Sequence, residues 1–89
     1  MARIHIAAAG NVEVPAYLTL VALGFELECD RGGRWTAGKG DAIFSADSPL
    51  ELLGLAAMYD ARGPQWQASD AEISAFLAKF GLSSNVRQP

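Results

Sequence analysis

The stretch SPLELLGLAAMYDARGPQW, residues 48–66, predicts the helix around which the rest of the chain is organised. Ser48 is a good N-cap, because its hydroxyl can accept a hydrogen bond from a free backbone N–H of the first turn. Glu51 stands where it can reach back and complete a capping box. Pro49 suits the first helical position, where its missing N–H costs nothing. We therefore expect a helix that begins at Pro49.

The interior of this helix is apolar around most of its circumference. A helix of that kind is buried on more than one side, so we expect it to pack on a sheet with another helix against it. Leu53 is the expected core residue, because it lies between Leu50 and Ala57 on one helical face. Gly63 can adopt the left-handed conformation that ends a helix, which places the last helical residue near Arg62.

Composition limits the class of protein. A chain of 89 residues with 51% hydrophobic residues forms one small domain, and it can bury a core without metal or disulfides. The net charge of −3 argues against nucleic-acid binding, which needs a basic surface. Cys29 is the only cysteine, which favours a reducing compartment. Polar residues interrupt the apolar N-terminal stretch too early for a signal peptide, so we expect a soluble, cytoplasmic protein without a membrane span.

Two segments alternate between apolar and polar residues, which is typical of strands. The first is residues 3–8, in which isoleucines alternate with Arg3 and His5. The second is residues 25–30, whose alternation predicts two faces. We expect a core face of Phe25, Leu27 and Cys29, and a solvent face of Glu26, Glu28 and Asp30.

The remaining elements follow from turn signals. Residues 15–23 can be strand or helix, and Pro15 with Gly24 favours a short helix carrying Tyr17, Leu20 and Val21 on one face with Val14. Gly32-Gly33 predicts a hairpin turn before strands over 35–37 and 42–46, with Trp35 facing the core. Ser69 and Glu72 predict a second capping box, and an amphipathic helix follows up to Gly81.

These elements predict an α+β fold in the order β-α-β-β-β-α-α. We expect a small mixed or mostly antiparallel sheet, with a right-handed parallel crossover between the first two strands and the helices packed on one face. Residues 1–82 form the expected single domain, and the polar residues 83–89 form an expected flexible C-terminal tail.

Motifs for chemistry are weak. The stretch GRWTAGKG, residues 33–40, matches a phosphate-binding loop except at its last position, but it lies between strands where the motif requires a following helix. His5 and Cys29 are expected on opposite faces of the sheet, which excludes a Cys–His nucleophile pair. One cysteine and one histidine do not make a zinc site. We expect no catalytic residues, no cofactor and no metal.

The remaining signals favour a protein partner. Glu26, Glu28 and Asp30 form an acidic strip, which Arg31 and Arg34 flank and with which they are expected to pair across strands. Trp66, in a loop, can cover the helices or anchor a partner. These six residues are the candidate partner-binding surface. The sequence predicts a non-enzymatic interaction module, such as an adaptor or an inhibitor of the immunity type. The alternative is a small-ligand binder or enzyme subunit with a pocket near Tyr17, Tyr59 and Trp66.

Overall fold

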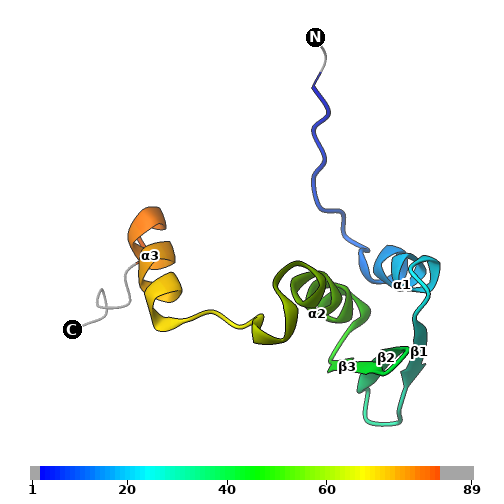
Figure 1. The fold of residues 1–89 in the computed structure, drawn as a ribbon. Helices are drawn as coiled ribbons and strands as arrows, with labels where there is room; N and C mark the ends of the chain where they lie inside the picture. The colour runs from blue at the N-terminus through cyan, green and yellow to red at the C-terminus, as the bar shows by residue number, and fades with distance from the viewer. Residues whose placement is uncertain (1–2, 83–89) are drawn as a thin grey trace.

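The computed structural model describes residues 3–82 and has an α+β fold in the order α-β-β-β-α-α. Three antiparallel strands form a meander in the order β1-β2-β3, and two helices, α1 and α2, pack against it (Figure 1). A third helix, α3, stands apart from the sheet (Figure 1). The elements are α1 Glu13–Ala22, β1 Glu26–Cys29, β2 Trp35–Lys39, β3 Ala42–Ala46, α2 Pro49–Arg62, the 3₁₀ turn η1 Gly63–Gln65, and α3 Asp70–Phe80.

The central helix α2 has the predicted bounds. Ser48 Oγ accepts the Glu51 N–H at 3.2 Å, as expected of an N-cap. In the expected capping box, Glu51 would accept the backbone N–H of Ser48. Its carboxylate instead accepts the N–H of the preceding residue, Asp47, at 2.8 Å. Gly63 follows the helix with φ 80, a backbone conformation that favours glycine.

The core lies between α1, α2 and the sheet. Leu20 of α1 and Leu52 of α2 are fully buried, and Ala37, Ala46 and Ala56 complete the cluster. Leu53, the expected core residue, is only half-buried at the edge of this cluster. The face of α1 also differs from the expected one, since Val14, Tyr17 and Val21 are exposed and Ala16 is buried beside Leu20. Helix periodicity permits several overlapping faces here, and the face that is buried carries Ala16 and Leu20.

The sheet register confirms the predicted alternation of β1. Leu27 pairs with Ala37, which pairs with Phe44, and all three face the helices. Trp35 pairs with Cys29 and is half-buried on the same side, as expected. Cys29 itself is exposed, which contradicts the expectation of a buried thiol. It lies at the end of an edge strand, where no helix covers it.

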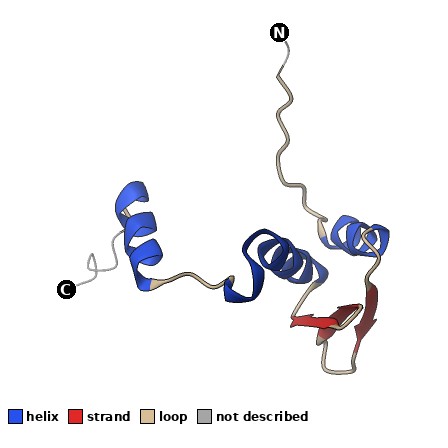
Figure 2. Cartoon of the chain, in the orientation of Figure 1, coloured by secondary structure: helices blue, strands red, loops and turns tan. Residues whose placement is uncertain are grey.

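The predicted N-terminal strand is wrong. Residues 3–8 form no strand, and Figure 2 shows them as an extended coil that leads away from α1. No parallel pair exists among the strands of residues 3–82, so the expected parallel crossover is also wrong. The alternation of Ile4 and Ile6 is a local pattern, and a strand forms only where a partner strand accepts its hydrogen bonds.

The third helix has the predicted ends but a different packing. Ser69 and Glu72 form a capping box, and Gly81 ends the helix in the left-handed conformation. None of the residues of α3 is buried, so it is not stacked on the sheet with the other helices. Together with the extended N-terminal coil, this arrangement accompanies a Cα radius of gyration of 16.6 Å, whereas about 12 Å is usual for a compact chain of this length. The predicted tail 83–89 lies outside the described residues.

Candidate functional site

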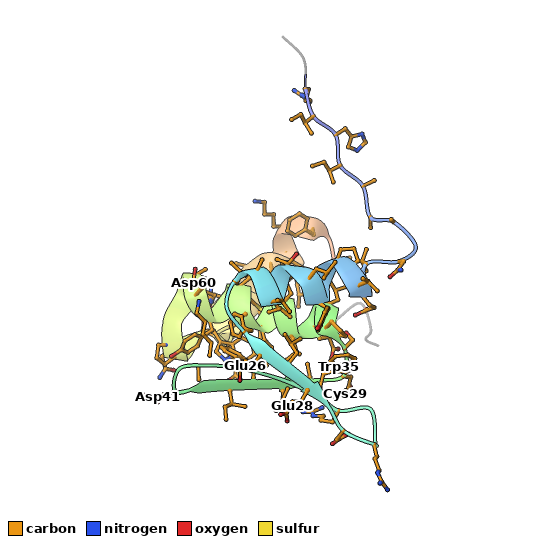
Figure 3. All side chains as sticks on the ribbon, turned by 90° about the vertical axis from the view of Figure 1, so that its right-hand side faces the viewer. Glu26, Glu28, Cys29, Trp35, Asp41 and Asp60 are labelled. Carbon is orange, nitrogen blue, oxygen red and sulfur yellow. The ribbon has the colours of Figure 1, made fainter. Side chains whose placement is uncertain are left out.

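The acidic pair of the candidate surface comes from one edge strand. Leu27 faces the helices, so Glu26 and Glu28 on either side of it face away from them. Both lie on β1, at the edge of the sheet (Figure 3). Neither carboxylate makes an ion pair within residues 3–82. The register places Thr36, Gly38, Ile43 and Ser45 on this uncovered face as well.

Asp30 does not continue the acidic strip. It follows β1, and its side chain closes the turn into β2 by accepting the Arg34 N–H at 2.9 Å. Its backbone carbonyl accepts the Gly33 N–H at 3.1 Å, and Gly33 has φ 87. The expected two-residue Gly-Gly turn is thus a longer loop in which one glycine has positive φ. Asp30 has a structural role that the alternation pattern does not indicate.

The expected cross-strand pairs of the arginines are not formed. Arg34 pairs with Asp47, with 2.9 Å between Nη1 and Oδ1. The register explains this choice, because Trp35 opposes Ala46 and so brings the neighbouring residues Arg34 and Asp47 together. Both side chains are more than half exposed, and such pairs contribute about 0–1 kcal/mol. Arg31 lies exposed in the turn, away from any partner within residues 3–82.

Trp66 belongs to a different part of the molecule. It follows η1 at the end of α2 and begins the segment that leads to α3, away from the sheet (Figure 1). Its side chain is half-buried, and its carbonyl accepts the Arg62 Nε–H at 2.7 Å. The six candidate residues therefore form two separate groups, one at β1 and its turn and one at the link between α2 and α3.

The apolar stripe of the amphipathic helix α3 is a candidate surface, because this helix does not pack on the sheet as expected. Ile73, Phe76 and Phe80 each expose about half of their surface, and Leu77 between them is only half-buried. The rings of Phe76 and Phe80 lie 5.2 Å apart between centroids, so they form one continuous apolar ridge. The spacing alone predicts this stripe correctly, but it does not indicate whether the stripe is covered.

Hydrogen bonds fix the start of α3. Glu72 Oε1 accepts the Ser69 N–H at 2.9 Å, and Ser69 Oγ accepts the Glu72 N–H at 3.1 Å. Arg62 of α2 donates to the same carboxylate from Nη2 at 2.9 Å. The Ser69 backbone bond and then the Arg62 contact lower the pKa of Glu72 below its usual value. One side chain thus both caps α3 and connects it to α2.

Tyr17 and Tyr59, which were expected beside one pocket with Trp66, border two different depressions in the described part of the chain. Tyr17 borders a shallow depression between the starts of α1 and α2, together with Trp35 and Pro49. Tyr59 borders a different one near Phe44, and its ring packs edge-on against Phe44 at 5.6 Å. Another depression, with a volume of about 310 Å³, is lined by Leu23, Phe25, Lys39, Leu53, Ala56, Ala57 and Asp60.

Lys39 is the cation at this depression, and its ammonium group already has partners within the chain. Its Nζ donates to the Leu23 carbonyl at 2.7 Å and lies 5.4 Å from the centre of the Phe25 ring. These contacts tie the end of β2 to the turn after α1. The lysine thereby satisfies a carbonyl beyond the end of the helix, as basic side chains commonly do.

In the described part of the chain, the single histidine and the single cysteine belong to different segments. His5 lies in the extended N-terminal coil, and Cys29 lies at the end of β1 (Figure 3). Within residues 3–82 no three His, Cys, Asp or Glu side chains gather closely enough to hold a metal ion. The Gly-rich stretch 33–40 contains β2 and its turns. The next element is β3, whereas a phosphate-binding loop requires a helix directly after it. Among the described helices, none is long and apolar enough to cross a membrane.

Comparison of the chain with models of protein families, with curated proteins and with solved structures gives no match.

Proposed function

We propose that this protein is a non-enzymatic interaction module, of the adaptor or inhibitor type, that presents α3 to an apolar groove on a partner protein. The exposed ridge of Ile73, Phe76 and Phe80 is the observation that supports it. Apolar side chains at this helical spacing are the anchors of helix-in-groove recognition. Half-exposed phenylalanines cost free energy in water, and a partner that covers them recovers it.

The way in which α3 is held suits this role. The helix is capped at both ends by its own residues, so it does not depend on the sheet for its start or its stop. Its link to α2 is an exposed ion pair between Arg62 and Glu72, which contributes about 0–1 kcal/mol. Because the helix is already formed, binding does not carry the entropic cost of folding it. The weak link to α2 allows α3 to change its orientation against a partner.

The test is affinity capture with immobilised protein, followed by identification of the retained proteins. Phe76→Ser with Phe80→Ser removes the ridge, and Ile43→Ser is the control, because Ile43 is also apolar and is even more exposed, on the sheet. We expect proteins that bind the wild type and the control and are lost with the double variant. The same retained proteins with all three baits would contradict the proposal, provided that circular dichroism shows intact folding.

A small-ligand binder is the second candidate function. The depression that contains Lys39 and Asp60 supports it, because apolar walls with a few charged groups are typical of ligand sites. A thermal-shift screen with common metabolites distinguishes the two functions. A ligand that raises the Tm of the wild type but not of Asp60→Asn would favour this second candidate.

A further inference from the structure

The N-terminal arm, defined here as residues 3–8, is an extended segment without a partner. Ile4 and Ile6 are 85% and 84% exposed, although their side chains are among the most apolar in the chain. The arm leads away from α1 and from the sheet of its own chain (Figure 1). Its alternation of Arg3, His5 and isoleucines is nevertheless that of a strand with one polar and one apolar face.

The edge of β1 offers the complementary surface. β1 is an outer strand, and the Asp30 N–H donates to the Arg34 carbonyl at 2.9 Å. In an antiparallel ladder the paired positions alternate, so Glu26 and Glu28 direct their backbone groups toward β2. The backbone groups of Leu27 and Cys29 are directed to the open edge. An extended segment can therefore add to β1 as a further strand.

The charges of the two outer strands favour β1 over β3 as the strand with which the arm pairs. With Ile4 placed beside Leu27, Arg3 and His5 lie beside Glu26 and Glu28, whichever way the arm runs. Ile6 then lies on the helix-facing side, beside Phe25 or Cys29. The open face of β3 instead carries Ile43 and Ser45, which offer no charge to Arg3. Opposite charges on neighbouring strands stabilise pairing, and Glu26 and Glu28 have no other ion-pair partner among residues 3–82.

We propose that the arm of one molecule pairs with the edge of β1 in a second copy of this chain. The reciprocal exchange adds a fourth strand to each sheet and closes a symmetric dimer. The second copy is the occupant because the arm points away from its own β1 in the structure. The proposal is independent of the proposed function, since it uses no residue of α3.

Sedimentation equilibrium over a wide concentration range tests the dimer. Arg3→Glu with His5→Glu, or Glu26→Arg with Glu28→Arg, places like charges together and should weaken the dimer by roughly tenfold or more. The combination of all four substitutions restores opposite charges and should restore the dimer. Arg31→Glu is the control, because it changes an exposed charge in the turn outside the proposed contact.

Cys29 provides a second readout in the same samples. If the arm runs parallel to β1, Ile6 lies beside Cys29, and the reaction of this thiol with Ellman's reagent should slow as the protein concentration rises, so the rate also reports the direction of the arm. The Arg3→Glu, His5→Glu variant should show no such dependence. A wild type that is monomeric throughout, as it would be if the arm folded onto its own sheet, overturns the proposal. A dimer that survives both charge reversals, or that Phe76→Ser abolishes, overturns it as well.

Discussion

The carboxylate of Glu13, in the first turn of α1, accepts the backbone N–H of Leu50, in the first turn of α2, at 2.9 Å. The first N–H groups of a helix have no partner within the helix, so side chains normally cap them. Here Ser48 satisfies the Glu51 N–H, and a residue from another helix satisfies that of Leu50. The negative charge also lies at the positive end of α2. This contact joins the starts of the two helices that cover the sheet.

Removal of that contact should destabilise the fold modestly. Glu13→Ala leaves the Leu50 N–H without its acceptor and should lower the free energy of unfolding by about 1 kcal/mol, as loss of a helix cap does. Urea denaturation measures the change. Glu13→Gln keeps an acceptor and should cost less. Glu26→Ala is the matched control, because Glu26 makes no ion pair within the described residues, and an equal loss there would contradict the assigned role of Glu13.

Leu52 should be the most sensitive position of α2. It is fully buried in the core, and truncation of such a leucine leaves a cavity. We expect Leu52→Ala to lower the free energy of unfolding by about 2–5 kcal/mol. Leu53→Ala should cost less, because Leu53 is half-buried at the edge of the core. Thermal denaturation of both variants checks the order, and a larger effect at Leu53 would contradict the described packing.

The start of α3 should weaken in acid through Glu72. Its pKa is lowered in the folded protein by the Ser69 backbone bond and by Arg62, from a usual value of 4.5. A carboxyl with a lowered folded pKa contributes stability above its unfolded pKa and loses it as the pH falls through the folded value. Helix content of α3 should therefore decrease as the pH falls below about 4.5.

Glu72→Gln is the variant that isolates this effect, since glutamine cannot titrate. Its α3 should be weaker than that of the wild type at neutral pH, and the difference should vanish in acid. Amide hydrogen exchange of residues 70–80 at several pH values measures it. An undiminished difference at low pH would show that the charge of Glu72 is not what supports the helix.

The Cys29 thiol should react readily in the native monomer. Cys29 is exposed at the end of β1, so at low protein concentration its rate with Ellman's reagent should approach that in denaturant. Ala37→Cys with Cys29→Ser gives a matched control, because Ala37 is 1% exposed on the neighbouring strand. That control should react slowly until the protein unfolds. Slow reaction of dilute wild type would contradict the exposed position.

Sequence alone predicted the elements whose signals are local. The caps Ser48 and Ser69 hold the helices that they predict, because capping needs only residues within one turn. The strands over 35–37 and 42–46 were also predicted from nearby turn residues, although β2 extends further, to Lys39, before the turn at Gly40. Alternation correctly directed Leu27 toward the helices and Glu26 and Glu28 away from them.

Only the tertiary structure decided which of these patterns find partners. The arm alternates as β1 does, yet it forms no strand, because it extends away from the sheet and pairs with none of its strands. Asp30 does not continue the acidic strip, because its side chain closes a turn. Arg34 pairs with Asp47, because the strand register places these two residues close together. The stripe of α3 is as apolar as a core stripe but remains exposed. A periodic sequence determines which side chains share a face, whereas burial depends on a second surface that lies elsewhere in the chain or in another molecule.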